Sequence, residues 1–144
     1  MNDDKINKYD LIYKKPWGYY ILHTLSEVYQ VKEICLANKQ DCFSYHFHKL
    51  VDEIWYIKKG HVHVVIGEFS GDAEEGKVFL IPKGYKHSLI NIGTSNAVIV
   101  ELQIGRIDHN DVFRLEDKYG RANLLRNSCH EESVEDCSKH LNNK

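Results

Sequence analysis

Four side chains of the types that hold divalent metal ions stand at spacings that suit neighbouring β-strands. They are His46 and His48, followed downstream by Glu53 and His87. Because successive side chains of a strand alternate between its two faces, residues 46 and 48 point the same way and can hold one ion. Three imidazoles and one carboxylate suit Zn, Mn, Fe, Ni or Co alike. We therefore predict one divalent metal ion as cofactor, bound at these four residues.

Turn residues stand where the chain must reverse to bring the four ligands together. Residues 49–52 can form a turn before Glu53, and Gly60 lies seven residues beyond it. The segment Pro82-Lys83-Gly84-Tyr85 predicts a second turn, because proline presets φ and glycine supplies a backbone angle that other residues avoid. This turn delivers His87 to the start of a strand that it shares with Asn91.

A second His-x-His segment repeats part of this pattern. His61-Val62-His63 is followed by Glu68 at the same interval, but no glycine stands seven residues after Glu68. The segment alternates His61, His63 and Val65 with three apolar residues, which predicts a half-exposed strand with its histidines outward. We assign it a structural role.

Short apolar runs with turn signals between them favour an all-β fold. No amphipathic helix separates the runs, so a double-sheet jelly-roll barrel is expected, and the connections are too short for parallel crossovers. Residues 70–72, Ser-Gly-Asp, predict a turn. We expect an N-terminal arm at 1–13, a β-barrel domain at 14–116 and a polar tail or short helix at 117–144. The predicted strands are residues 19–23, 29–36, 43–48, 53–57, 61–66, 77–81, 87–91 and 97–104.

Charge and composition argue against several classes of partner. The formal net charge is −2, the pI is near 6.5 and basic residues are scattered, so nucleic acid is not an expected partner. No apolar run is long enough to cross a bilayer, and the N-terminus does not resemble a signal peptide, so we expect a cytoplasmic protein without membrane contact. The four cysteines match no secreted framework, which favours reduced thiols, and the Cys129 and Cys137 tail lacks the Cys-x-x-Cys pairs of structural zinc sites.

The two metal-ligand blocks resemble the conserved motifs of the cupin superfamily. Outside them, residues 15–20 (Lys-Pro-Trp-Gly-Tyr-Tyr), 111–114 (Asp-Val-Phe-Arg) and 116–121 resemble the cupin domain of type II mannose-6-phosphate isomerases, often fused behind a mannose-1-phosphate guanylyltransferase. The likeness covers about residues 14–121. It implies a cupin double-stranded β-helix, and the sequence shows no glycine-rich transferase loop, so we expect no guanylyl transfer by this chain alone.

The chain departs from that family pattern close to the predicted metal ligands. Gln40 replaces the leading glycine of the first motif, so Asn38 is expected to make the turn, since asparagine tolerates left-handed geometry. The interval from His48 to the glutamate is longer than usual. Ile54-Trp55 stands in place of His-Trp, and Lys49 in place of a frequent arginine. These differences affect substrate identity more than metal binding.

The ligand set suits aldose–ketose isomerisation of a sugar phosphate. A divalent ion polarises a carbonyl and stabilises the oxyanion that forms when the adjacent C–H loses its proton. The reaction also needs a base, for which we select Glu101, because a glutamate on an inward barrel face would have a raised pKa. Lys86 is predicted to act in catalysis and in phosphate binding, and Arg114 and Gln103 in substrate binding.

The resemblance implies a specific reaction and a biosynthetic pathway in which that reaction takes part. It points to interconversion of mannose 6-phosphate and fructose 6-phosphate in nucleotide-sugar and polysaccharide biosynthesis, with a small sugar phosphate as ligand. Two alternatives remain open from the residues: a non-catalytic sugar-binding module, or a cupin metalloenzyme of another class, such as an Fe-dependent oxygenase, a lyase or an epimerase. A homodimer is expected, because pairing covers exposed sheet edges.

Overall fold

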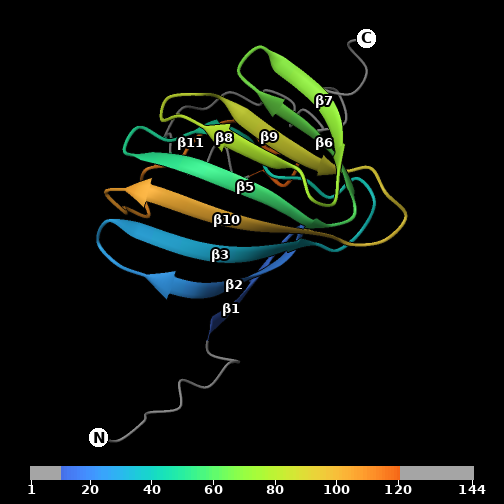
Figure 1. The fold of residues 1–144 in the computed structure, drawn as a ribbon, viewed down its shortest axis with the longest axis horizontal. Helices are drawn as coiled ribbons and strands as arrows, with labels where there is room; N and C mark the ends of the chain where they lie inside the picture. Colours follow the sequence, from blue (N-terminus) through green and yellow to red (C-terminus); the bar gives the residue numbers. More distant parts are fainter. Residues whose placement is uncertain (1–10, 121–144) are drawn as a thin grey trace, which may run out of the picture.

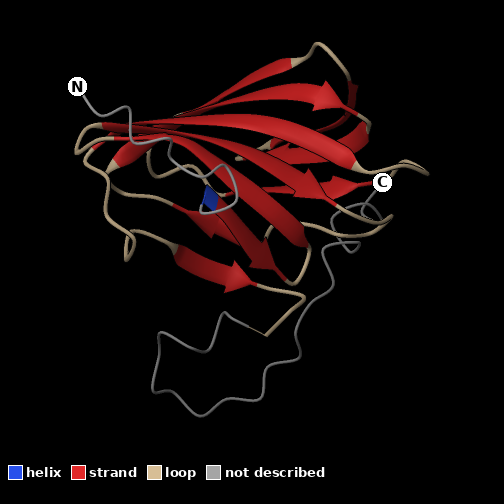
Figure 2. Cartoon of the chain, turned by 90° about the horizontal axis from the view of Figure 1, so that it is seen from below, coloured by secondary structure: helices blue, strands red, loops and turns tan. Residues whose placement is uncertain are grey.

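The computed structural model describes residues 11–120, which form eleven β-strands and no α-helix. This confirms the predicted all-β class (Figures 1 and 2). The strands are β1 (Ile12–Lys15), β2 (Gly18–Leu25), β3 (Tyr29–Leu36), β4 (Tyr45–Phe47), β5 (Val51–Lys59), β6 (His61–Ile66), β7 (Phe69–Glu74), β8 (Val78–Ile81), β9 (His87–Asn91), β10 (Ala97–Gly105) and β11 (Phe113–Glu116).

The strands form two antiparallel sheets, as expected for a jelly roll. One sheet has the order β1-β2-β3-β10-β5-β8 and the other the order β11-β4-β9-β6-β7. In Figure 1, β10 and β5 lie side by side although more than thirty residues separate them along the chain. The predicted ligand strands are therefore divided between the sheets, with β5 in the first and β4 and β9 in the second.

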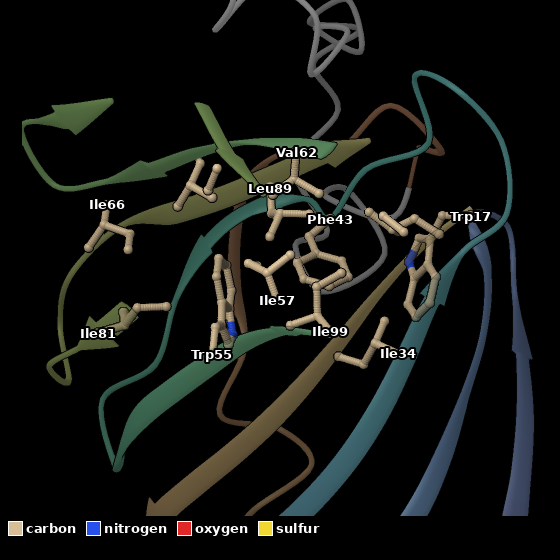
Figure 3. Close-up of a cluster of buried hydrophobic side chains, with 14 residues drawn as sticks. Trp17, Ile34, Phe43, Trp55, Ile57, Val62, Ile66, Ile81, Leu89 and Ile99 are labelled. Atoms are coloured by element: carbon tan, nitrogen blue, oxygen red, sulfur yellow. The ribbon is translucent and has the colours of Figure 1, made fainter. Parts of the chain in front are cut away.

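Apolar side chains from both sheets form one buried core (Figure 3). Phe43 packs edge to face between Trp17 and Trp55, with ring centroids 5.6 and 5.5 Å away. Such edge-to-face pairs add to the gain from area burial. The ring centroid of Trp55 is also 5.3 Å from that of His87, so the core extends to one of the predicted ligands. The remaining members are Ile34, Leu36, Ile57, Val62, Val64, Ile66, Ala73, Ile81, Leu89, Ala97 and Ile99.

The strand predictions hold best where the hydrophobic pattern is strong. The predicted bounds of β3, β6 and β9 are those of the structure. The turn expected at residues 70–72 is wrong, because these residues lie inside β7, which pairs with β6. The hairpin reverses at Gly67, where φ is 54°. Strand β7 was missed since it is mostly exposed and contains Gly71, which lies under the ring of Phe69.

The turn before β4 is made differently from the prediction. Gln40, not Asn38, adopts the left-handed backbone conformation, with φ of 74°. The Asp41 carboxylate accepts hydrogen bonds from the backbone and side-chain nitrogens of Asn38 at 2.9 and 3.1 Å. The carbonyl of Gln40 accepts a hydrogen bond from Lys118. These contacts hold a conformation that glycine would adopt without strain.

Two further expectations need correction. His63 lies on the face of β6 opposite Val62 and Val64, as predicted, but it is only 2% exposed. Its ring contacts Asp72 (Nδ1–Oδ1, 2.5 Å) and Ser70 (Nε2–Oγ, 2.8 Å) on the paired strand β7, which explains its burial. Cys35 is a buried free thiol, but Cys42 is disulfide-bonded, so the expectation of reduced thiols is wrong there.

The predicted domain boundaries are only partly covered. Among the described residues, the first strand begins at Ile12 and the last one ends at Glu116, and the predicted boundaries stay predictions. The predicted tail or short helix falls almost wholly outside the described residues. Within residues 11–120, the structure contains no helix with the length and apolar character needed to cross a membrane.

Candidate metal centre

The structure brings together the four side chains that the sequence singled out. His46 lies in β4 and is the direct cross-strand partner of His87 in β9. His48 follows the end of β4, and Glu53 lies in β5 of the other sheet. One ligand atom from each of the four residues lies within 4.8 Å of all the others. This spacing allows one ion to contact all four side chains.

Backbone carbonyls orient all three imidazoles in the same way. Nδ1 of His46 donates to the carbonyl of Ser44 at 2.7 Å, and Nδ1 of His87 donates to that of Tyr85 at 2.8 Å. Nδ1 of His48 donates to the carbonyl of Asp111. Because a carbonyl only accepts, the proton of each neutral ring is on Nδ1, and Nε2 presents its lone pair. Metal-binding histidines are typically held this way.

The carboxylate of Glu53 completes a buried donor set. Glu53 and His87 are each 1% exposed. Oε1 of Glu53 lies 2.7 Å from Nε2 of His48, and Oε2 lies 3.5 Å from Nε2 of His87. Among the described residues, Glu53 Oε2 and His87 Nε2 are buried without a hydrogen-bond partner. Since unpartnered buried polar atoms are costly, this arrangement fits a bound cation.

The electrostatics of the cluster also suit a divalent cation. Burial and the neighbouring rings hold the pKa of His46 well below its usual value, and burial also lowers the pKa of His87. Burial favours the neutral ring of His48 too, but the hydrogen bond to Glu53 outweighs it and raises the pKa. Burial opposes the charge of Glu53, yet the hydrogen bond from His48 and the other imidazoles lower its pKa. The set thus offers an ionised carboxylate, and the rings of His46 and His87 are held neutral.

Asp111 braces the turn that lies between two of the predicted ligands, His48 and Glu53. Its carboxylate accepts hydrogen bonds from the backbone nitrogens of Lys49 and Leu50 at 2.8 and 2.9 Å, and its carbonyl accepts the Nδ1 proton of His48. Asp111 is 6% exposed. The brace fixes the backbone between His48 and Glu53. Reasoning from the residues did not identify it, because these contacts join positions more than sixty residues apart.

A cavity of about 300 Å³ lies beside His46 and His48. Its walls combine the aromatic side chains of Trp17, Tyr20 and Phe43 with polar and charged groups. The charged and polar lining residues include Gln30, Lys32, Glu101, Gln103 and Arg114. A pocket of this size with an aromatic wall and a few polar groups is typical of small-molecule sites.

Glu101, the predicted base, is a buried carboxyl group on the cavity wall. It lines the cavity from β10, is 8% exposed and accepts a hydrogen bond from Trp55 Nε1 at 3.1 Å. Lys32 is its cross-strand partner on β3. Burial, reinforced by the charge of Glu53, raises the pKa of Glu101 to about 7. A carboxyl group with this pKa can accept and return a proton near neutral pH.

The raised pKa of Glu101 predicts a pH-dependent stability. Between its usual value of 4.5 and about 7, the folded chain keeps a proton on Glu101 that the unfolded chain has released. The stability from the neutral carboxyl is therefore complete below pH 4.5 and is lost as the pH rises through about 7. Metal-free wild type should lose stability relative to Glu101→Gln across this range. Urea unfolding at pH 5 and pH 8 measures the free energy of unfolding of both proteins. If wild type and Glu101→Gln differ by the same amount at both pH values, the raised pKa of Glu101 is contradicted.

The other predicted substrate-binding residues have different positions. Arg114, on β11, pairs with His46 and lines the cavity. Gln103 also lines it, with its amide hydrogen-bonded to Glu53. Lys86 is exposed and is not among the cavity-lining residues, so its predicted place at the cavity rim is wrong. The reason is alternation: His87 points inward, and its neighbour in the chain therefore points outward.

Lys32 is a cavity-lining cation that sequence reasoning missed. Its Nζ lies 4.9 Å from the centre of the Tyr20 ring, an orientation that holds the ammonium group against the aromatic wall. The available signal was the alternation of Gln30, Lys32 and Ile34, which places all three on one face of β3. That face is the inward one, since Ile34 belongs to the core.

This chain is similar to a known protein family and to several curated proteins. The family described as "Mannose-6-phosphate isomerase C-terminal" matches residues 1–117. Mannose-1-phosphate guanylyltransferase of Salmonella montevideo is 34% identical over 110 residues, which cover 74% of this chain and 23% of that protein. Alginate biosynthesis protein AlgA of Pseudomonas syringae is 32% identical over 112 residues, which cover 77% of this chain and 23% of that protein. The chain thus spans about a quarter of the length of these curated relatives.

Solved structures support the fold. The cupin domain of Schizosaccharomyces pombe Cnp3 aligns with a TM-score of 0.56 and 15% identity, covering 60% of this chain and 64% of that one. TT1209 of Thermus thermophilus aligns with a TM-score of 0.60 and 22% identity, and the alignment covers 70% of this chain and 96% of TT1209. These likenesses concern the fold alone. Together with the family match, they show that this chain belongs to the mannose-6-phosphate isomerase C-terminal family and has the cupin fold.

Proposed function

We propose that this chain is a metal-dependent isomerase that interconverts mannose 6-phosphate and fructose 6-phosphate. One observation carries the proposal: three oriented imidazoles and an ionised carboxylate lie beside a cavity that also contains Glu101, a buried carboxyl group with a pKa of about 7. The family name supports the choice of sugar phosphate. A role in nucleotide-sugar and polysaccharide synthesis is consistent with the names of the relatives.

The proposed reaction assigns separate tasks to the residues of the cavity. His46, His48, Glu53 and His87 would hold a divalent ion, which supplies polarisation of the substrate carbonyl when bound. Glu101 removes the proton from C2 of the aldose and delivers it to C1. The C1 oxygen gains a proton and the C2 hydroxyl loses one, so the products balance as the ketose. The pKa of Glu101 suits both halves of this transfer.

Cations on the cavity wall are suited to the phosphate group. Lys32 and Arg114 line the cavity on strands of opposite sheets, β3 and β11. Charge-assisted hydrogen bonds from lysine and arginine are the usual protein contacts of a phosphate. The ring of Tyr20, beside Lys32, offers an apolar surface for the sugar carbons. Anchoring the phosphate would hold C1 and C2 in place for proton transfer.

A coupled assay tests this proposal directly. Purified protein is stripped with a chelator, reloaded separately with Mn, Zn, Co, Ni or anaerobic Fe(II), and given mannose 6-phosphate. Fructose 6-phosphate is detected through phosphoglucose isomerase and glucose-6-phosphate dehydrogenase. We expect turnover only after reloading with at least one metal. Saturable sugar-phosphate binding without turnover would instead indicate a binding module, and metal-dependent oxygen consumption would indicate an oxygenase.

We also propose that two copies of this chain pair through the outer face of the six-stranded sheet. Strands usually point apolar side chains inward and polar ones outward, but β10 does the reverse near the cavity. Glu101 and Gln103 point inward, and Leu102 and Ile104 point outward. On the edge strand β8, Val78 and Leu80 are 61% and 65% exposed. An apolar face of this kind on a sheet edge is typical of an interface.

A second copy is the occupant we favour, because this face is largely apolar and two of its charged residues pair with each other. Glu33 and Lys58 form an ion pair at 3.1 Å, so this pair leaves no net charge to select an acidic or basic partner. Leu80→Lys should therefore convert a dimer to a monomer in sedimentation-velocity experiments. Phe69→Lys, at an exposed position on β7 of the other sheet, is the control and should leave the dimer intact. A monomeric wild type would contradict the proposal.

A further inference from the structure

We propose that Gln103 and Gln30 are positioning residues that determine which oxygen of Glu53 faces the metal site. The inference rests on the proposed metal binding. Gln103 Nε2 donates to Glu53 Oε1 at 2.7 Å, and Gln30 Nε2 donates to Gln103 Oε1. We call Gln30 and Gln103 the glutamine relay. Both residues are buried, with 5% and 6% exposure.

The register of three adjacent strands builds the relay. Gln103 on β10 is the direct partner of Gln30 on β3 and of Glu53 on β5. The three side chains therefore lie in one row across the inward face of the six-stranded sheet. A row of two amides ending at a carboxylate is an ordered hydrogen-bond chain, and the strands that carry it are fixed by their own backbone ladders.

The chemistry of the groups fixes the direction of this chain. An ionised carboxylate can only accept, so the amide of Gln103 must turn its nitrogen toward Glu53. Its oxygen then faces Gln30, and Gln30 must donate in turn. A glutamate that binds a metal ion does so as the ionised carboxylate. The charge on Glu53 thus sets the orientation of both glutamines.

The relay leaves the two oxygens of Glu53 in different situations. Oε1 is held by Gln103 and lies near His48. Oε2 lies 3.5 Å from His87 Nε2 and has no hydrogen-bond partner among the described residues. We infer that Oε2 is the oxygen offered to the ion, and that Gln103 prevents the carboxylate from rotating. This assigns Gln103 a task other than the substrate binding predicted from the sequence.

Metal affinity and a metal spectrum test the relay. Gln103→Met and Gln30→Met remove the amides while keeping unbranched side chains of similar length. Loss of such a supporting contact weakens metal binding by about 10- to 100-fold, and we expect this range for Gln103→Met and its lower end for Gln30→Met. Competition with a chelator gives the Co²⁺ affinity, and the visible spectrum of the Co²⁺-loaded protein reports the ligand arrangement. Leu102→Met, next to Gln103 but on the outward face, is the control.

The possible results distinguish a failure of the glutamine relay from a failure of the proposed metal site. If wild type binds no Co²⁺, the metal site itself is wrong. If wild type binds and both methionine variants keep its affinity and spectrum, the metal site stands and the relay is overturned. Thermal unfolding of the chelated variants shows whether they fold. An altered spectrum in a folded variant supports the relay, since a loss of general stability would not move it.

A substitution with an opposite electrostatic expectation sharpens the test. Gln30→Glu adds a negative charge to the cavity wall, and attraction alone would tighten cation binding. The relay predicts weaker binding, because an ionised Glu at position 30 cannot donate to Gln103. The Gln103 amide would then turn its nitrogen toward position 30 and its oxygen toward Glu53. Measured at pH 8, a lower Co²⁺ affinity supports the relay, and an equal or higher affinity contradicts it.

Discussion

Replacing Glu101 by glutamine is expected to lower the turnover of mannose 6-phosphate by about 10²- to 10⁴-fold, the usual contribution of a positioned acid–base group. Glutamine keeps the length of the side chain and an oxygen that can accept the hydrogen bond from Trp55. It cannot take up the C2 proton. The metal content should not change, because Glu101 is not one of the four clustered ligands. Steady-state kinetics and elemental analysis of the same sample measure both quantities.

The pH profile provides the control for this substitution. The pKa of Glu101 is raised to about 7 by burial and by the charge of Glu53. A bound metal cation near Glu101 would lower this pKa. The loss of wild-type turnover toward acid pH should therefore have its midpoint at about pH 7 or below. This loss should be absent from the residual activity of Glu101→Gln. A variant with wild-type turnover would show that another group is the base.

Replacing His87 by alanine is expected to remove stoichiometric metal binding and, with it, the isomerase activity. His87 is 1% exposed, and its Nε2 faces the Glu53 carboxylate. Removing a direct ligand should cost more than the roughly 10- to 100-fold loss in affinity that follows loss of a supporting contact. Elemental analysis after loading and chelator competition measure the metal content and the affinity.

His63→Ala is a matched control for this loss. His63 is also a strand histidine, is 2% exposed, and contacts a carboxylate at 2.5 Å. It lies in the second His-x-His segment and is not part of the four-residue cluster. Its variant should lose some stability and keep one metal ion per chain. If His63→Ala loses the metal while His87→Ala retains it, the assignment of the two segments is reversed.

Local patterns were sufficient to predict the four residues that cluster in the structure. The alternation of a strand fixed the common direction of His46 and His48, and the proline-glycine turn before His87 predicted the start of β9. These rules depend on neighbouring residues, so they do not need the tertiary structure. The same alternation would have excluded Lys86, since it directly precedes an inward ligand.

Features that depend on strand pairing were not accessible from the sequence. The brace from Asp111 joins the turn at residues 49–50, which follows β4, to a segment more than sixty residues downstream. The glutamine relay needs the register of β3, β10 and β5, which local patterns do not determine. Gln40 shows the same limit for a turn, because contacts from Asp41 and Lys118 hold a conformation that its own side chain disfavours.

The most direct test of the metal centre is anomalous X-ray diffraction from crystals of the metal-loaded chain. We predict one anomalous peak per chain, at about 2.0–2.3 Å from Nε2 of each clustered histidine and from a carboxylate oxygen. The predicted ligands are His46, His48, His87 and Glu53. Absence of a peak there at saturating metal, or a peak beside His63 and Asp72 instead, would contradict the account.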